Sequence, residues 1–480
     1  MTFQGEQTLL ILGASGDLAA RLLVPGLGSL IASDAVDGVS LVGSAADDWD
    51  DERWRSRVAE SFAAVGAEGE RIDAVAETTP YVKADVTAET EWRRVLDACD
   101  GSVVIYFALP PAVTERACQA LAGVDLPPGT RLVFEKPFGT DAASAKALNQ
   151  LVTRIVPEER VFRVDHFLGT STVMNIAGLR FANRIFEPLM SAEHVASVDI
   201  VFDETLGLEG RAGYYEDTGA LIDMIQSHLL QVMSVVAMDP PSTIGERDVR
   251  DAKAAILRAC SVRDGEPVAN SYRARYTAGE VDGRRLPSYA DEDGIARDST
   301  TETLAEVVLE IDTWRWAGVP FRLRSGKALG NPRQEVVVTF KRAPHIPRGL
   351  TGGDHPGRLR IGIALDAGRV TLDLNVNGPG DPRKIDPVSI DTGVAPGELR
   401  EYGEVLRSIF AGDPILSVRG DMAVETWRVI EPVLSAWRDD RVPLEEYPAG
   451  STGPNGWPLS GVVAGAALHR HAATRRDGSR

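Results

Sequence analysis

Residues 8–19, Thr8-Leu9-Leu10-Ile11-Leu12-Gly13-Ala14-Ser15-Gly16-Asp17-Leu18-Ala19, decide the fold of the N-terminal part of the chain. The apolar run 8–12 is typical of a buried parallel strand, and it ends in a glycine-containing turn that opens a helical pattern. Gly13 and Gly16 would let the backbone turn tightly and approach a pyrophosphate at a helix N-terminus. The stretch does not complete the Gly-x-Gly-x-x-Gly pattern, so an ordinary strand-to-helix turn is the alternative.

Three further apolar runs follow, at residues 39–43, 103–108 and 131–134, with helical patterns between them. Strands that alternate with helices predict a parallel sheet covered on both faces. Ligands of such sheets bind at the carboxyl ends of the strands, where the turn motifs of this chain lie.

The pattern changes after about residue 170. Alternating strands are predicted at 196–202, 303–311, 335–340, 358–363 and 369–374, and long helices near 219–237, 245–262 and 421–438. We therefore expect two domains, as the 480 residues also suggest. Residues 1–170 should form a doubly wound α/β domain that binds a dinucleotide. Residues 171–480 should form an α+β domain on a large, mainly antiparallel sheet, for substrate binding and assembly into a homodimer or homotetramer.

Composition narrows the class of partner. A net charge of −19 argues against nucleic acid and anionic membranes. No uninterrupted apolar stretch is read as a membrane span, and the N-terminus lacks the pattern of a secretion signal. Cys99, Cys118 and Cys260 show neither disulfide nor metal spacing, which suits the cytoplasm and gives no support for a metal site.

Two histidine segments carry the chemical signal: Arg163-Val164-Asp165-His166-Phe167-Leu168-Gly169 and Gln226-Ser227-His228-Leu229-Leu230-Gln231. They resemble the RIDHYLGK and QNHLLQ signatures of the glucose-6-phosphate dehydrogenase family. Residues 13–19, 135–139, 213–219, 319–327 and 447–454 match other family motifs in the family order. The resemblance implies a Rossmann-type cofactor domain. It also implies hydride transfer from carbon 1 of glucose 6-phosphate to NADP or NAD, giving 6-phosphogluconolactone at the start of the pentose phosphate pathway.

The same resemblance assigns roles to individual residues. His228 would be the general base and Asp165 its orienting partner, because histidine titrates near neutrality and a carboxylate fixes its tautomer. By spacing alone, His228 could equally be a core histidine of an apolar helix. The substrate residues would be Lys136, His166, Thr170, Glu204, Asp223 and Lys327. The cofactor residues would be Gly13, Ala14, Ser15, Gly16, Asp17, Leu18, Ala46 and Lys136.

The chain departs from the family pattern where phosphate groups are held. Phe167 and Thr170 replace a tyrosine and a lysine of the substrate-phosphate motif, and Ile222 and Pro332 stand at other basic positions. Three alternatives therefore stay open: a dehydrogenase of another aldose or aldose phosphate, an enzyme like glucose–fructose oxidoreductase, and a non-catalytic nucleotide-binding paralogue.

The second departure concerns the cofactor. Ala46 stands where the family carries an arginine, and Asp47 and Asp48 follow it. Carboxylates at the end of the second strand favour the free ribose of NAD over the 2′-phosphate of NADP. Arg21 is the alternative source of the missing positive charge.

Overall fold

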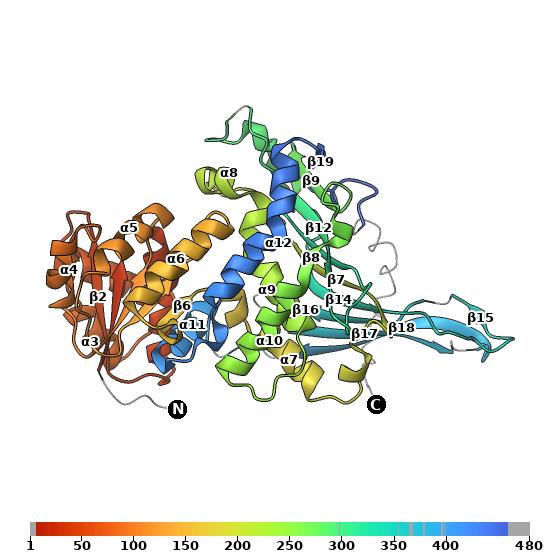
Figure 1. Cartoon of the computed structure of the whole chain (residues 1–480), viewed down its shortest axis with the longest axis horizontal. Coiled ribbons are helices and arrows are strands. Elements are labelled where there is room, and N and C mark those ends of the chain that lie inside the picture. The colour runs from red at the N-terminus through yellow and green to blue at the C-terminus, as the bar shows by residue number, and fades with distance from the viewer. Residues whose placement is uncertain are drawn as a thin grey trace, which may run out of the picture.

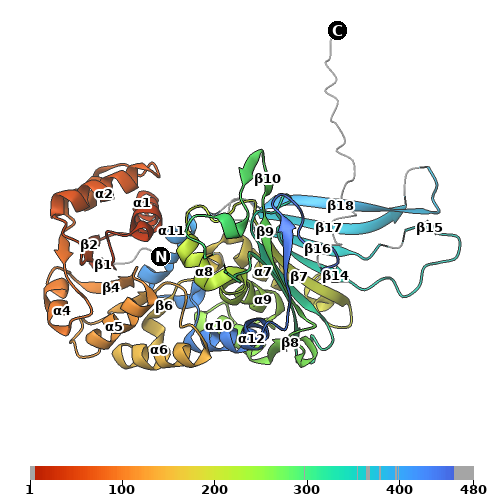
Figure 2. The ribbon, with the colours of Figure 1, turned by 90° about the horizontal axis from the view of Figure 1, so that it is seen from above.

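The structure is a computed structural model, and it describes residues 6–458 except 297, 354, 364–367, 378–379, 395–396 and 398. Figures 1 and 2 show an α/β body at the N-terminal end beside a second body built on a broad sheet. The long helix α12 (Gly420–Arg438) lies across the second body, and α11 (Glu401–Ala411) lies against the first.

The first sheet consists of β1 (Gln7–Leu12), β2 (Val39–Ala45), β3 (Tyr81–Lys83), β4 (Ser102–Phe107), β5 (Arg131–Phe134) and β6 (Val161–Arg163). Their order is β3-β2-β1-β4-β5-β6, and every pair is parallel. This is the doubly wound, dinucleotide-binding topology. The prediction of a parallel sheet is therefore confirmed, although the three-residue strands β3 and β6 were not foreseen.

Helices cover both faces of this sheet. The π-helix η1 (Ala19–Leu23), α1 (Val24–Ala32), α2 (Asp51–Ala63) and α3 (Glu70–Thr78) share one core, and α4 (Glu89–Leu96), α5 (Pro111–Leu121) and α6 (Ala142–Ile155) lie on the other face. Helix α11 completes the first of these cores, where Tyr402, Leu406 and Phe410 pack with residues of α1 and β1. The chain thus returns to its N-terminal body after building most of the second one.

The second sheet has eleven strands: β7 (Val195–Asp203), β8 (Cys260–Val262), β9 (Ser271–Thr277), β12 (Leu304–Ile311), β13 (Phe321–Gly326), β14 (Gln334–Phe340), β15 (Thr351–Gly352), β16 (Arg358–Gly362), β17 (Gly368–Asn377), β18 (Lys384–Val394) and β19 (Leu444–Pro448). Most neighbours are antiparallel, and β7–β13, β9–β19 and β15–β18 are parallel. The mainly antiparallel sheet is confirmed. The helix expected over 245–262 ends earlier, because Cys260–Val262 pair with β12 instead.

One face of the second sheet is covered by α7 (Ser171–Phe181), the π-helix η5 (Leu221–Leu229), α9 (Leu230–Ala237), α10 (Glu246–Ala259) and α12. The run Ala212–Ala237, which joins α8 (Ala212–Ala220), η5 and α9, is long and apolar enough to cross a bilayer, contrary to our reading of the sequence. In the structure 89% of its most apolar window is buried inside the protein. Its apolar composition therefore matches a core helix, and the polar residues that it buries are Asp223, Gln226, His228, Gln231 and Ser234.

Candidate active site

The glycine loop stands at the carboxyl end of β1. Gly13 has a φ of 83°, and a Cβ there would lie 2.3 Å from the carbonyl oxygen of Ala108, so only glycine fits. The Gly13 amide donates to the Ser44 carbonyl at 2.7 Å, Ala14 is buried, and Gly16 and Asp17 are exposed at the start of the helical segment. Leu18 is half-buried behind them. A tight backbone turn before a helix fits a pyrophosphate group.

The end of β2 presents acidic groups to this loop. The Ser15 hydroxyl donates to Asp47 Oδ2 at 2.5 Å, and Ala46 is exposed beside it. Asp48 Oδ1 lies 2.8 Å from Lys83 Nζ. Arg21, the alternative base for a 2′-phosphate, lies 3.9 Å from the Asp17 carboxylate. Each of these nearby cations therefore already has an acidic neighbour.

The structure brings Asp165 and His228 together across 63 residues of chain. Asp165 Oδ1 lies 2.6 Å from His228 Nδ1 and accepts the Phe167 amide at 3.0 Å. Asp165 follows β6 and caps the short 3-10 helix η3 (His166–Gly169), and His228 lies on η5. Both are buried, and His228 Nε2 has no hydrogen-bond partner in the described part of the chain. With Nδ1–H donated to Asp165, Nε2 presents a lone pair.

The charges around the dyad favour this arrangement. Burial and the Lys136 ammonium lower the pKa of His228, although Asp165 opposes them, so the imidazole is neutral near pH 7. Burial raises the pKa of Asp165, but His228, His166 and Lys136 outweigh it and the net pKa is lowered. A neutral imidazole oriented by a carboxylate is the form that accepts a proton.

Asp165, His166 and His228 could also be read as a metal cluster, since their ligand atoms lie within 4.8 Å of one another. Two ligands of a tetrahedral zinc at ~2.0 Å stand about 3.3 Å apart. The 2.6 Å between Asp165 and His228 is shorter than that and fits a hydrogen bond. The geometry thus favours the dyad over a shared metal.

Lys136 and Asp223 form a second polar pair beside the dyad. Lys136 Nζ donates to Asp223 Oδ1 and to the Asp223 carbonyl, both at 2.8 Å. Burial raises the pKa of Asp223, but Lys136 outweighs it and holds the pKa well below its usual range. The Tyr214 hydroxyl also donates to Asp223 Oδ1, at 3.1 Å. Tyr214 lies in the motif at residues 213–219, but nothing in that motif singles it out.

Lys327 and Glu204 form the third pair. Lys327 Nζ lies 2.9 Å from Glu204 Oε2 and 5.4 Å from the centre of the Tyr215 ring. The Lys327 ammonium also lowers the pKa of Asp223, so Lys327 lies near the pair formed by Lys136 and Asp223. Each ammonium group of this region thus has a carboxylate beside it. A ligand with several hydroxyls could donate hydrogen bonds to the carboxylates and accept them from the ammonium groups.

In the segment after Asp165, side chains pack on one another and on His228, and the Thr170 hydroxyl bonds to groups of the protein. The Phe167 ring stacks on the His228 ring with centroids 4.3 Å apart. Thr170 is buried, and its hydroxyl donates to the Phe167 carbonyl at 2.7 Å and accepts from Thr172 at 3.2 Å. His166 lies edge-on to His228 at 4.8 Å, and burial, His228 and Lys136 lower its pKa to about 3. These residues therefore present no fixed positive charge.

Sequence reasoning missed an anchor behind His166. The Glu135 carboxylate accepts hydrogen bonds from the hydroxyls of Tyr106 and of Tyr402, the latter at 3.2 Å. The Tyr402 ring stacks on His166 with centroids 6.2 Å apart. Tyr402 comes from α11, 267 residues after Glu135, and no local pattern could have linked them.

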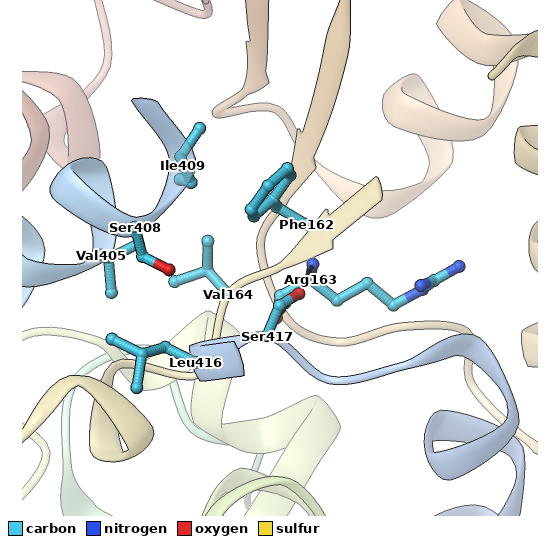
Figure 3. Close-up of a pocket in the computed structure, with 8 residues that line it drawn as sticks. All are labelled: Phe162, Arg163, Val164, Val405, Ser408, Ile409, Leu416 and Ser417. Atoms are coloured by element: carbon cyan, nitrogen blue, oxygen red, sulfur yellow. Dashed lines mark hydrogen bonds between the residues drawn. The ribbon is translucent and has the colours of Figure 1, made fainter. Parts of the chain in front are cut away.

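A small pocket lies next to this region but not in it. Figure 3 shows its lining residues, Phe162, Arg163, Val164, Val405, Ser408, Ile409, Leu416 and Ser417, which come from β6, α11 and the segment before α12. It borders the strand that leads to Asp165, and none of the predicted site residues lines it. The polar row from Asp165 to Lys327 is therefore the better candidate for the active site.

Comparison with known proteins decides the family. Residues 10–175 match the glucose-6-phosphate dehydrogenase NAD binding domain, and residues 177–458 match the C-terminal domain of the same enzyme family. The chain belongs to the glucose-6-phosphate dehydrogenase family. As a family member it is an NAD(P)-dependent oxidoreductase.

The relatives cover nearly the whole chain. The glucose-6-phosphate 1-dehydrogenase of Gluconobacter oxydans is 38% identical over 462 residues, which is 92% of this chain and 94% of the relative. The crystal structure of the Mycobacterium avium enzyme superposes with a TM-score of 0.81 at 32% identity, covering 94% of this chain and 96% of that one. A glucose-6-phosphate dehydrogenase in complex with its substrate gives 0.84 at 26% identity, covering 95% and 97%. The dehydrogenase fold thus extends over both bodies.

Proposed function

We propose that this protein oxidises carbon 1 of glucose 6-phosphate to the lactone and so feeds the pentose phosphate pathway. The observation that carries the proposal is the buried Asp165–His228 pair with its unpartnered Nε2. The family relatives named as glucose-6-phosphate 1-dehydrogenases support the choice of substrate.

In this proposal His228 Nε2 takes the proton of the carbon 1 hydroxyl. NAD or NADP, held over the glycine loop of residues 13–18, would supply the hydride acceptor. Loss of a hydride from the same carbon would turn its carbon–oxygen bond into the lactone carbonyl. Asp165 keeps Nδ1 protonated and stabilises the imidazolium that forms. Burial of both residues excludes water and strengthens this interaction.

The sugar hydroxyls would be held by Lys136, Asp223, Glu204 and Lys327, whose pairs offer donors and acceptors beside the dyad. Lys136 would also border the nicotinamide. The cofactor pyrophosphate would lie over Gly13, Ala14, Ser15, Gly16, Asp17 and Leu18, where the first helix begins. His166 and Thr170 would face the far end of the sugar.

A second candidate substrate is an aldose without a 6-phosphate. The observation that favours it is the self-satisfied segment in which Phe167 covers His228 and Thr170 bonds to Phe167. A phosphate dianion gains roughly 1.5–3 kcal/mol from each hydrogen bond to a charged donor. A substrate without that group needs none of them.

For the cofactor we propose a preference for NAD over NADP. Asp47 reaches the glycine loop through Ser15, and a carboxylate there can accept a ribose hydroxyl but repels a 2′-phosphate. Ala46 offers no compensating charge, and Lys83 and Arg21 lie next to Asp48 and Asp17.

For the organisation of the protein we propose that residues 1–170 bind the cofactor and that residues 171–480 complete the substrate site and the subunit contact. β17 and β18 extend from the second body (Figure 2) and expose Leu374, Val376, Val388 and Ile390. A second copy covering this apolar strip would give a homodimer or homotetramer. Light scattering of the purified protein tests this, and Ile390→Lys should dissociate the oligomer.

We place the enzyme in the cytoplasm, which suits three free cysteines, and cell fractionation would check that.

The test of function is steady-state reduction of NAD and of NADP with glucose 6-phosphate, glucose and other aldose phosphates. Efficient turnover of glucose 6-phosphate supports the proposal. Turnover of free glucose with little turnover of the phosphate would favour the second candidate. Nucleotide binding without turnover of any sugar would contradict both and leave a non-catalytic nucleotide binder.

A further inference from the structure

The helix that carries Asp223 and His228 begins at a break in the chain. α8 and η5 meet near Gly219, whose φ of 59° and ψ of −178° are not helical. Ala220 precedes η5 and has no side chain that caps it. The first amides of η5 therefore need acceptors from another part of the fold.

Glu302, just before β12, provides those acceptors. The Leu221 amide donates to Glu302 Oε1 at 2.9 Å, and the Ala220 amide donates to the Glu302 carbonyl at 3.3 Å. A Cβ on Gly219 would lie 2.4 Å from Glu302 Oε1. The carboxylate can therefore approach the helix this closely only because residue 219 is a glycine.

The next residue extends the same support to the third polar pair. The Lys327 amide donates to the Thr303 carbonyl at 2.9 Å, and the Thr303 and Tyr447 hydroxyls lie 2.9 Å apart. Residues 302 and 303 therefore anchor both the helix with His228 and the loop with Lys327.

Glu302 is a buried carboxylate that accepts a hydrogen bond from a backbone amide. It is 8% exposed, and within the described ranges no ion pair joins it to a cation. The charged and titratable groups that face it are Arg273 from β9, Tyr215 from α8 and Tyr289 from the short helix Tyr289–Asp291. The pKa values of both tyrosines are raised, so they stay neutral at neutral pH. Arg273 is hydrogen-bonded to Asp440.

We propose that Glu302 is a positioning residue for the reaction, because its carboxylate holds the first turn of the helix on which Asp223 and His228 stand. The inference rests on the proposed function. An ionised carboxylate at a helix N-terminus interacts favourably with the helix dipole, so the charged form holds η5 more firmly than the neutral form.

The charge of Glu302 changes within the working range of pH. Burial raises its pKa to about 7, although the amides of Leu221, Glu302 and Ala220 lower it. Activity should therefore have two acid limbs. The Glu302 limb lies near pH 7, and the limb of His228 lies below its ordinary pKa of about 6.5 because that pKa is lowered.

The test is Glu302→Gln, which keeps the acceptor oxygen but cannot ionise. We expect kcat at pH 8 to fall roughly fivefold, the size of a charge–dipole interaction, with little change in the KM for NAD. The wild type should lose a similar factor between pH 8 and pH 6, and the variant should not. Glu302→Asp, which keeps the charge, should keep the pH step.

Glu310→Gln is the matched control. Glu310 lies on β12, the strand that follows Glu302, and accepts the Asp264 amide at 3.2 Å, remote in the chain from the residues of the dyad. Its profile should follow the wild type. A Glu302→Gln enzyme with wild-type kcat and a wild-type step near pH 7 would overturn the inference.

Hydrogen exchange separates this inference from the proposed function. Amides of residues 220–229 should lose protection in Glu302→Gln at pH 8 and keep it in Glu310→Gln, whatever sugar is oxidised. An inactive wild type contradicts the function alone. Equal protection in the wild type and in Glu302→Gln would contradict the role of Glu302.

Discussion

The two ends of the segment from Asp165 to Thr170 treat their polar groups in opposite ways. Asp165 faces the site and leaves His228 Nε2 without a partner. Thr170 turns its hydroxyl back to the Phe167 carbonyl. The reacting end is thus poised for a substrate, and the other end is satisfied within the protein. Chemistry and recognition can therefore diverge within six residues, because different side chains are involved at the two ends of the segment.

Removing the base would break the comparison at its reacting end. We expect His228→Ala to lower kcat by roughly 10²–10⁴-fold, the usual contribution of a general base. The dissociation constant for NAD, measured by fluorescence titration, should stay within about twofold of the wild type. Asp165→Asn should also lower kcat, because the amide no longer fixes the imidazole tautomer. His194→Ala is the control at a partly exposed histidine, and a fully active His228→Ala would refute the dyad.

The same division between retained chemistry and altered recognition is expected at the cofactor loop. Ala46→Arg with Asp47→Ser replaces a carboxylate by a guanidinium, which should raise the ratio of NADP to NAD in kcat/KM about 100-fold. Binding of 2′,5′-ADP, measured by calorimetry, should strengthen in parallel. Glu52→Gln removes a nearby exposed carboxylate and should change neither ratio nor binding. An unchanged ratio in the double variant would mean that Asp47 does not face the ribose.

Restoring polar groups at positions 167 and 170 would sharpen the comparison. Phe167→Tyr with Thr170→Lys should lower the KM for glucose 6-phosphate roughly tenfold through new charge-assisted hydrogen bonds. The KM for glucose should not fall, since glucose lacks the phosphate. Thr140→Lys adds the same charge at an exposed site and is the control. Because position 170 is buried, the thermal stability of the double variant should be measured together with its kinetics. An equal gain for both sugars would argue against a phosphate contact.

The sequence predicted those parts of the fold that have a local signal. The continuous apolar runs of β1 and β5 identified the parallel sheet, and the motifs singled out Asp165 and His228, whose side chains lie within hydrogen-bond distance in the structure. Strand β13 was not predicted, because Arg322 and Arg324 look exposed in sequence but pair with Asp199 and Asp203 across the sheet. Burial of charge by a distant partner leaves no periodic pattern.

The supports of the site were hidden for the same reason. Tyr402 reaches Glu135 from a helix whose amphipathic pattern does not say which core it joins. Glu302 caps η5 across 81 residues of chain, and nothing around it in the sequence distinguishes it from a surface glutamate. Local patterns thus give elements and motifs, whereas second contacts that hold a site depend on tertiary packing.

The smallest expected effect tests whether the part of the segment with His166, Phe167 and Thr170 excludes water. Burial lowers the pKa of His166 to about 3, below its unfolded value of about 6.5. Below pH 6.5 the unfolded chain binds a proton at His166 that the folded protein does not, so stability is lost as the pH falls from 6.5 towards 3. The loss should be about 1 kcal/mol per pH unit from this one group. His166→Asn should reduce the pH dependence of the free energy of unfolding in urea between pH 6 and pH 5 by that amount, and Thr140→Asn at an exposed, non-titrating position should not. An unchanged slope would mean that His166 is protonated in the folded enzyme, and the segment would then offer a phosphate the positive charge that Phe167 and Thr170 do not.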